Sequence, residues 1–168
     1  MIALARADDR LIHGLVAVAW TSSVAPETIL VANDAAAADS FKKETMRLAK
    51  PAGVKLFIKS VESSAKALNN PINDGKRILL ITASVEDAER VYSLLDEGRK
   101  FTALDIGTAG IVEKEGETYK LVIPGVYVSK EEYEAAKRLA QRGVDVFCQA
   151  NPALEKASLS DIGKALEK

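Results

Sequence analysis

The segment IALARADDRLIHGLVAVAW, residues 2–20, combines the patterns of a strand, a short loop and a helix. In residues 1–7, Ile2 and Leu4 are expected on one face of a β-strand, because side chains alternate between the two faces. From residue 14 to residue 20 the apolar residues change to helical spacing. The heptapeptide DDRLIHG, residues 8–14, therefore lies at a strand-to-helix corner. It contains His13, the only histidine of the chain.

The same alternation continues along the rest of the sequence. Short apolar runs predict further strands at residues 28–32, 54–58, 77–82, 103–106 and 144–148. Helical patterns occupy residues 41–48, 61–68, 84–97, 129–142 and 159–166. We therefore expect an α/β protein with a single domain over residues 1–168, in which a mostly parallel sheet has helices on both faces.

Local signals refine this prediction. Ser129 and Glu132 have the spacing of a capping box, and Gly98 is expected to end the helix that starts at Ser84. The segments around Glu115-Gly116-Glu117 predict a local antiparallel hairpin.

The composition is that of a globular protein near electrical neutrality. Lys and Arg number 23 and Asp and Glu number 24, so the formal net charge is -1 and no overall field would draw the chain to nucleic acid or to an anionic membrane. Cys148 is the only cysteine, which excludes multi-cysteine metal motifs and fits a reducing compartment. No apolar run approaches the roughly 18 residues that span a bilayer. We expect a soluble cytoplasmic protein with no metal and no organic cofactor.

The heptapeptide has the chemistry of a phosphoryl acceptor. At a helix start the first backbone N–H groups lack partners, so the position suits an anion and disfavours a protonated imidazole. A neutral His13 can act as a nucleophile, and the Arg10 guanidinium matches phosphate oxygens. Gly14 leaves room for a bulky donor. Asp8 or Asp9 could orient the other ring nitrogen or hold Arg10.

In parallel sheets the site lies beyond the carboxyl ends of the strands. His13 and Arg10 are therefore the candidate catalytic residues. Further candidates for holding the phosphate, or for supporting the residues that do, are Arg6, Asp9, Gly14, Asn33 and Asp34.

Less specific interpretations compete with this one. A lone histidine at a helix start is often a cap or a solvated loop residue. Arg6, Arg10 and the two aspartates could form a surface ion-pair cluster, worth about 0 to 1 kcal/mol. Trp20 is expected in the core rather than stacked on a ligand, and Cys148 is expected as a small buried hydrophobe rather than a nucleophile.

Other phosphate and hydrolase chemistries lack essential parts. A receiver-type aspartyl phosphorylation site would use Asp8 and Asp9, but it needs an aspartate after the third strand, where Lys59-Ser60 stands. The sequence contains neither a glycine-rich nucleotide loop nor a nucleophile elbow.

The stretch RADDRLIHGLVAVAW, residues 6–20, resembles the signature of the IIB component of the phosphoenolpyruvate-dependent sugar phosphotransferase system, in its mannose/fructose/sorbose family. The family pattern runs R-x-D-D-R-L-I-H-G-Q-V, followed by a tryptophan. The match continues in VAND at residues 31–34, PAGVKL at 51–56 and QRGVDV at 141–146. Two places depart from the pattern: Leu15 replaces the usual glutamine, and Gly107-Thr108-Ala109-Gly110 replaces a tighter glycine pair.

The resemblance implies a domain that accepts a phosphoryl group on His13 from a phosphohistidine of a IIA domain. The group then passes to a sugar that enters through a membrane IIC/IID pair, which is the activity of a protein-N(pi)-phosphohistidine sugar phosphotransferase. The resemblance implies Nδ1 as the reacting nitrogen and Arg10 as the arginine that holds the phosphoryl oxygens. The protein would act in the cytoplasm and transiently at the inner face of the membrane. Because the membrane component binds the sugar, the IIB sequence does not name it, and monomer and homodimer both stay open.

Two hypotheses from different classes follow. The first is the phosphotransfer enzyme, in which Arg6 and Arg10 form a basic patch that faces an acidic rim on the donor. The second is a non-catalytic partner-binding or regulatory protein with the same fold. Such a protein would have no use for an intact His13, Arg10 and Gly14.

Overall fold

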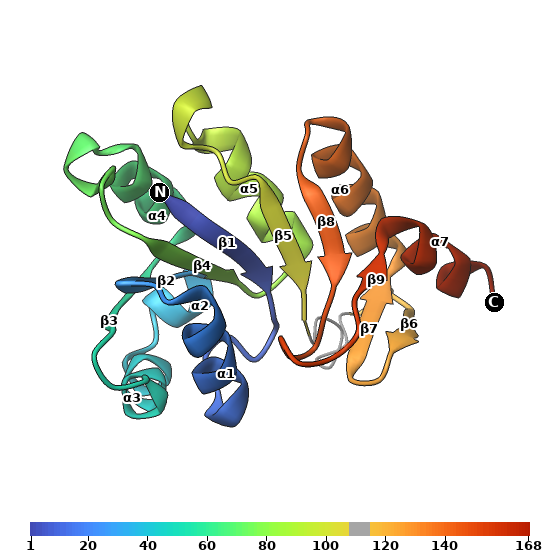
Figure 1. The fold of residues 1–168 in the computed structure, drawn as a ribbon, viewed down its shortest axis with the longest axis horizontal. Coiled ribbons are helices and arrows are strands. Elements are labelled where there is room, and N and C mark those ends of the chain that lie inside the picture. The colour runs from blue at the N-terminus through green and yellow to red at the C-terminus, as the bar shows by residue number, and fades with distance from the viewer. Residues whose placement is uncertain (108–114) are drawn as a thin grey trace.

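A mostly parallel sheet forms the centre of the protein (Figure 1). The computed structural model describes residues 1–107 and 115–168, and at residues 15 and 16 the backbone alone. The strands of this sheet are β1 (Ile2–Ala7), β2 (Thr28–Ala32), β3 (Lys55–Lys59), β4 (Ile78–Thr82), β5 (Ala103–Ile106), β8 (Asp145–Cys148) and β9 (Ala157–Ser158). They lie in the order β3-β2-β4-β1-β5-β8-β9, and β9 pairs antiparallel to β8 while the other pairs are parallel. The predicted α/β class is confirmed, and β1 lies at the middle of the sheet.

Helices cover both faces of the sheet, as predicted. The longer ones are α1 (Gly14–Val24), α3 (Ser40–Ala49), α4 (Val61–Asn69), α5 (Val85–Leu94), α6 (Lys130–Gln141) and α7 (Leu159–Glu167). The short ones are α2 (Asp34–Ala37), η1 (Pro71–Asn73) and η2 (Glu97–Arg99). Buried side chains of α1, α2 and α3 form one core with strand residues, and those of α4, α5, α6 and α7 form the other.

An irregularity near the start of β1 places its first apolar side chains in different cores. The pairing of β1 with β4 shifts register between Ile2 and Leu4. Ile2 belongs to the core under α4 and α5, whereas Leu4 belongs to the core under α1. The prediction that both lie on one face is therefore wrong, because a bulge reverses the alternation of side chains. After the bulge, Arg6 is on the same face as Leu4 and lies against α1.

The predicted antiparallel hairpin is confirmed, and its described strands follow the segment around Glu115-Gly116-Glu117. It consists of β6 (Tyr119–Ile123) and β7 (Val126–Ser129), which pair antiparallel. Pro124 and Gly125 join the two strands, and Gly125 has φ +82°. Proline presets φ and glycine accepts a positive φ, so this pair makes the tight turn. Glu115 and Gly116 form a turn that precedes β6, and the segment on the other side of this turn lies outside the described residues.

Helix α5 ends at Leu94, earlier than the predicted stop at Gly98. The Asn69 side chain of α4 donates to the Leu94 oxygen at 2.9 Å and accepts the Asp96 N–H at 2.9 Å. This side chain satisfies main-chain groups at the helix end that would otherwise lack partners. Gly98 lies in η2 instead.

The predicted N-caps of α5 and α6 are confirmed. Ser84 Oγ accepts the N–H of Asp87, and Ser129 Oγ accepts the N–H of Glu132, each at 3.1 Å. The buried Glu132 carboxylate accepts the Val85 N–H at 3.1 Å, so it links α6 to the first turn of α5.

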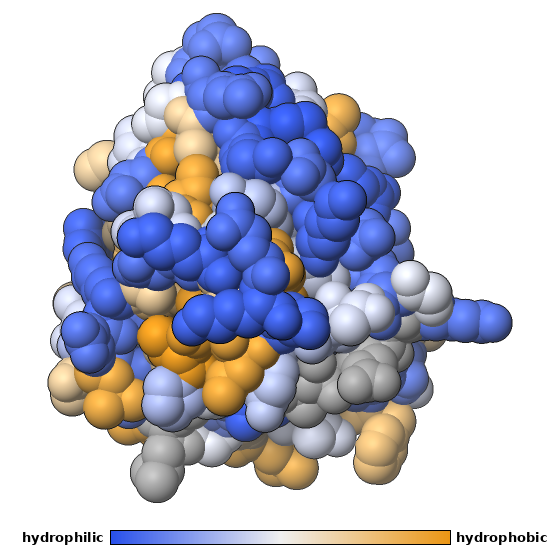
Figure 2. All heavy atoms as spheres, turned by 90° about the vertical axis from the view of Figure 1, so that its right-hand side faces the viewer, coloured by the Kyte–Doolittle hydropathy of each residue, from blue (hydrophilic) through white to orange (hydrophobic). Residues whose placement is uncertain are grey.

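In the part of the chain that the structure describes, no helix combines the length and the apolar character needed to cross a bilayer. Figure 2 views the molecule from the side that carries α7 and the hairpin. Hydrophilic side chains dominate the upper part of this face, and hydrophobic ones gather in the lower part. Exposed apolar residues of the hairpin are Leu121 and Tyr127.

Candidate functional site

His13 lies at the start of α1, in the loop that follows the central strand β1. It is the N-cap residue, with an extended backbone at φ −154° and ψ 137°, and 23% of its side chain is exposed. Leu11 at φ +60° and Gly14 at φ +38° adopt left-handed conformations on either side. The Leu11 N–H donates to the Asp8 main-chain oxygen at 2.8 Å. These turns fold the loop back, so that His13 returns to the end of β1.

The Asp8 carboxylate is the point where the polar groups of the loop converge. Its Oδ2 lies 3.0 Å from His13 Nε2. Its Oδ1 accepts the Arg10 N–H at 3.0 Å and lies 3.6 Å from Arg10 Nε. Asp8, and not Asp9, is therefore the carboxylate on the imidazole. An ionised carboxylate only accepts hydrogen bonds, so the neutral His13 ring carries its proton on Nε2 and its lone pair on Nδ1.

Arg6 lies beneath the loop and is almost fully buried, with 2% of its surface exposed. Its guanidinium forms ion pairs with Asp8, at 3.3 Å, and with Asp105. It also donates to the main-chain oxygens of Gln149, at 2.9 Å, and Ala150, at 3.3 Å. The prediction that Arg6 contributes to an exposed basic patch is therefore wrong. The alternation of β1 turns this side chain inward, where two carboxylates compensate its charge.

Trp20 and Gly107 fix the position of the Arg6 guanidinium. Arg6 Cζ lies 4.7 Å from the centroid of the Trp20 ring, and Trp20 Nε1 donates to the Ala150 oxygen at 3.4 Å. A Cβ at position 107 would collide with the Arg6 guanidinium, so only glycine fits there without displacing it. Trp20 is buried, as predicted, and it packs on a cation as well as on apolar side chains.

Asp105 completes the series of charged groups below His13. It lies on β5, directly opposite Arg6 of β1, and is fully buried. Its Oδ1 accepts the Gln149 N–H at 2.8 Å. Burial raises the pKa of the Asp105 carboxyl to about 7, although the charge of Arg6 acts in the opposite direction. Sequence reasoning missed this residue; the available signal was an aspartate within the otherwise apolar strand ALDI.

Arg10 lies on the outer side of the loop, with 36% of its side chain exposed. It borders a groove of about 370 Å³ whose lining residues come from the loop, from the segment after β2 and from α3. These residues are Asp9, Arg10, Leu11, Ile12, Asn33, Ala35, Phe41, Lys42, Thr45 and Met46. The predicted candidates Asp9 and Asn33 therefore share the groove with Arg10.

Asn33 and Asp34 have contacts that organise the backbone around this groove. Asn33 Oδ1 accepts the Ala36 N–H at 2.8 Å and so caps α2. Asp34 Oδ1 accepts the Val61 N–H at 2.9 Å, and its Oδ2 lies 3.4 Å from Arg90. Asp34 thus ties α2 to the start of α4 and to the middle of α5, whereas the groove is lined by Asn33.

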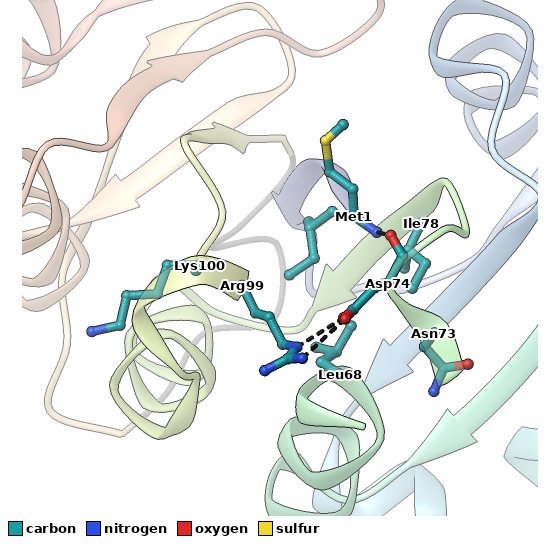
Figure 3. A pocket seen from close by; sticks show the side chains of 9 residues that line it. Met1, Leu68, Asn73, Asp74, Ile78, Arg99 and Lys100 are labelled. Carbon is teal, nitrogen blue, oxygen red and sulfur yellow. Dashed lines mark hydrogen bonds and ion pairs between the residues drawn. The ribbon is translucent and has the colours of Figure 1, made fainter. Parts of the chain in front are cut away.

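A larger cavity, of about 440 Å³, lies at the opposite end of the sheet (Figure 3). Its lining includes Met1 and Ile78, which precede or begin strands β1 and β4, whereas His13 follows the carboxyl end of β1. Inside it, Arg99 holds the Asp74 carboxylate in a bidentate ion pair. This cavity is therefore separate from the histidine loop.

Two further observations concern ligands and reactive groups. Within residues 1–107 and 115–168, no three side chains of the His, Cys, Asp or Glu type are grouped so that they could hold a metal ion. Burial raises the pKa of the Cys148 thiol far above its usual range, so the reactive thiolate is disfavoured. The departures from the family pattern at Thr108, Ala109 and Gly110, and the side chain of Leu15, lie outside the described part of the protein.

Fold and loop together define an α/β protein whose one histidine stands at a strand-to-helix corner, with one ring nitrogen held by a buried carboxylate. The chain belongs to the IIB components of the sugar phosphotransferase system, because the family model described as "PTS system sorbose subfamily IIB component" matches residues 2–168. The resemblance seen in the sequence is thereby confirmed, and the chain is a component of a phosphotransferase system.

Two relatives agree with this assignment. A probable phosphotransferase enzyme IIB component of Streptococcus pyogenes serotype M6 is 38% identical over 164 residues, which are 96% of this chain and 99% of the relative. The mannose-specific EIIAB component of Escherichia coli K12 is 33% identical over 168 residues, which are 100% of this chain and 50% of the relative.

Two solved structures have the same fold. The IIB domain of the sorbose permease from Klebsiella pneumoniae has a TM-score of 0.86 at 24% identity, with 98% of this chain and 97% of that chain covered. The structure of manxB from Thermoanaerobacter tengcongensis has a TM-score of 0.85 at 28% identity, with 98% and 95% covered.

Proposed function

We propose that residues 1–168 form one IIB phosphocarrier domain, in which His13 accepts a phosphoryl group from a phosphorylated IIA domain and passes it to a sugar at a membrane IIC/IID complex. The observation that carries this proposal is the 3.0 Å contact between His13 Nε2 and Asp8 Oδ2. It leaves the lone pair on Nδ1, which makes no hydrogen bond to any described residue. A purely partner-binding protein of the same fold would not need this arrangement.

The first step is a displacement at phosphorus. The Nδ1 lone pair of His13 attacks the phosphorus of the donor phosphohistidine, and a new N–P bond forms as the donor's N–P bond breaks. The donor imidazole leaves with the bonding electron pair. The His13 ring keeps its Nε2 proton and gains positive charge, which the Asp8 carboxylate stabilises at 3.0 Å.

The second step reverses the role of His13. A sugar hydroxyl attacks phosphorus and gives its proton to water, while His13 Nδ1 leaves with the electron pair of the N–P bond. The hydrogen bond to Asp8 holds the ring in one tautomer throughout, so no proton has to move between the ring nitrogens.

Arg10 is placed to receive the phosphoryl oxygens. Its main-chain N–H and its Nε both address Asp8 Oδ1, at 3.0 and 3.6 Å, so the carboxylate that holds His13 also positions this guanidinium. The partly exposed guanidinium can neutralise oxygen charge as the phosphoryl group moves between two imidazoles.

The proposed partners follow from the chemistry and from the relatives. One relative is named as a mannose-specific EIIAB component, and this chain spans half of its length, which supports a IIA domain as the donor. We place the protein in the cytoplasm, with transient contact at the inner face of the membrane where a IIC/IID pair would bind the sugar. No cofactor takes part in either step.

The test is phosphoryl labelling of His13→Ala by a phosphorylated IIA domain. The variant should keep its fold, because a loop residue with part of its side chain exposed contributes little to the core, and it should take up no label. Lys164→Ala, on the remote helix α7, is the control and should label stoichiometrically. Full labelling of folded His13→Ala would overturn the assignment and favour a non-catalytic role for His13.

A further inference from the structure

Asp105 is a buried carboxylate that never touches His13, yet it shares an arginine with the carboxylate that does. Arg6 lies between Asp105 and Asp8 and forms an ion pair with each. Asp8 in turn contacts His13 at 3.0 Å. The result is a continuous series of charged groups from the middle of β5 to the reactive imidazole.

The Arg6 guanidinium is held in this position from several directions. Its Nη1 binds Asp105 and donates to the Gln149 oxygen, and the Gln149 N–H donates to the other oxygen of Asp105. The backbone of Gly107 leaves no space for the guanidinium to move in that direction. Because β1 and β5 pair in register at Arg6 and Asp105, the sheet itself fixes this geometry.

We propose that Asp105 is a positioning residue for His13, which keeps Arg6 from drawing the Asp8 carboxylate away from the imidazole. Asp8 Oδ2 is shared, since it lies 3.0 Å from His13 Nε2 and 3.3 Å from Arg6 Nη2. With Asp105 ionised, the guanidinium has a second anionic partner and shares Asp8 Oδ2 with the imidazole. Without that charge, Asp8 is the one carboxylate left to Arg6 among the described residues, so the guanidinium competes with His13 for the same oxygen.

The charges of the cluster support this role. Asp8 and Asp105 contribute two negative charges, and Arg6 and Arg10 contribute two positive charges, so these four groups sum to zero when both carboxylates are ionised. Burial raises the pKa of Asp105 to about 7 even with Arg6 beside it, so the carboxylate carries its negative charge above this pH. Removing Asp105 leaves one positive charge in excess next to the imidazole, which opposes the positive ring formed during transfer.

A purely structural role for Asp105 predicts a different outcome. In that case its loss would lower the free energy of unfolding but would leave the His13 hydrogen bond and the transfer step unchanged in the folded molecules. The two roles are separated by readouts at His13 itself. The chain contains one histidine, so an imidazole nitrogen spectrum has a single, unambiguous set of signals.

The experiment compares Asp105→Asn with Asp145→Asn at pH 8, without any phosphoryl donor. Both substitutions remove one carboxylate charge, but Asp145 is exposed at the amino end of β8. In the wild type and in Asp145→Asn, the Nε2 proton of His13 should be observed, because the bond to Asp8 slows its exchange with water. In folded Asp105→Asn, this exchange should be about tenfold faster, corresponding to about 1.4 kcal/mol of lost bond strength. Unchanged exchange in the folded variant would overturn the proposal.

Gly107→Ala is the second variant, because it displaces Arg6 without removing a charge. A methyl group at position 107 collides with the guanidinium, whereas the control Gly75→Ala meets no atom within 4 Å. We expect faster Nε2 proton exchange in Gly107→Ala and wild-type exchange in Gly75→Ala. If Asp105→Asn does not fold, Gly107→Ala and its control still test the positioning role. Wild-type exchange of the Nε2 proton in folded Gly107→Ala would count against the proposal.

The part of this role that concerns phosphoryl transfer rests on the proposed function. Transfer from a saturating phosphorylated IIA domain should be about tenfold slower in Asp105→Asn, or about 1.4 kcal/mol, while the donor concentration for half-maximal rate stays the same. The exchange measurement uses unphosphorylated protein. It therefore fails only if the positioning role is wrong, whereas absent labelling of the wild type would count against the proposed function.

Discussion

In two Arg–Asp pairs at opposite ends of the sheet, the pKa of the aspartate shifts in opposite directions. At the amino end, Arg99 holds Asp74 in an exposed pair at 2.8 and 2.9 Å, and this bond lowers the pKa of Asp74 (Figure 3). At the carboxyl end, Arg6 pairs with Asp105 in the interior, and burial raises the pKa of Asp105 to about 7. Water solvates the first pair, and protein surrounds the second.

This comparison also shows what locates the candidate site. The larger cavity is at the amino end, about 440 Å³ against about 370 Å³ for the groove beside Arg10. The ion pair between Arg99 and Asp74 at this end is open to solvent, and it makes no hydrogen bond or ion pair with the described residues of the histidine loop. At the carboxyl end, buried charges converge on His13 through Asp8. The convergence of buried charges on His13, rather than cavity size, therefore favours the carboxyl end as the candidate site.

Substituting the carboxylate at each end should give the largest contrast. Asp8→Asn should slow phosphoryl transfer by roughly 1,000-fold, or about 4 kcal/mol, because it weakens the bond to His13 and the placement of Arg10 together. Asp74→Asn should transfer at the wild-type rate. Single-turnover transfer from a phosphorylated IIA domain measures the rate of each variant. Equal rates in the two variants would contradict the placement of the site at the carboxyl end of the sheet.

Replacing the arginine at each end should have a smaller effect. Arg10→Lys keeps the charge but loses the planar fork. The activation free energy of transfer should therefore rise by roughly 1.5 to 3 kcal/mol, the value of the lost charge-assisted hydrogen bonds. Arg99→Lys is the matched control and should leave the rate unchanged. If Arg10→Lys also transfers at the wild-type rate, then Arg10 is only an ion-pair partner of Asp8.

The contributions of Asp105 and Asp74 to the free energy of unfolding should change with pH in opposite directions. Because the folded-state pKa of Asp105 lies above its ordinary value of 3.8, its stabilising effect is present below about pH 4 and is lost as the pH rises through about 7. The slope is at most about 1.4 kcal/mol per pH unit. For Asp74, with a lowered pKa, the contribution is present above 3.8 and is lost as the pH falls through the folded-state value.

Urea unfolding at several pH values tests this sign. Between pH 4.5 and 7, wild type should lose stability relative to Asp105→Asn, which lacks the titrating group. A difference between the two proteins that does not change over this range would show that Asp105 does not titrate there.

Salt should have the smallest effect. Arg6 is buried, so among the described residues that line the groove the cations are Arg10 and the exposed Lys42. Raising the ionic strength to several hundred millimolar should slow transfer from subsaturating donor by roughly threefold, because exposed charges are screened. Lys42→Glu should flatten this dependence, and Lys164→Glu on α7 should not. Rates that do not respond to salt would indicate an apolar docking surface.

The alternation of strands and helices and the position of the histidine loop were predictable from the sequence, because both depend on local spacing. The partners of Arg6 were not, because Arg6 and Asp105 are 99 residues apart and meet only through the pairing of β1 with β5. The early bulge in β1 was equally hidden, since it depends on the register with β4. The choice of Asp8 over Asp9 required the positive φ of Leu11, which turns the loop back on itself.

The central claim is that His13 Nδ1 carries the phosphoryl group while Asp8 holds Nε2. The direct measurement is phosphorus–nitrogen coupling in protein labelled with nitrogen-15 histidine and phosphorylated by a IIA domain. The single histidine makes the assignment unambiguous. We predict coupling of phosphorus to Nδ1 and a proton on Nε2. Coupling to Nε2, or a stable phosphoprotein with no phosphorus–nitrogen coupling, would contradict the account.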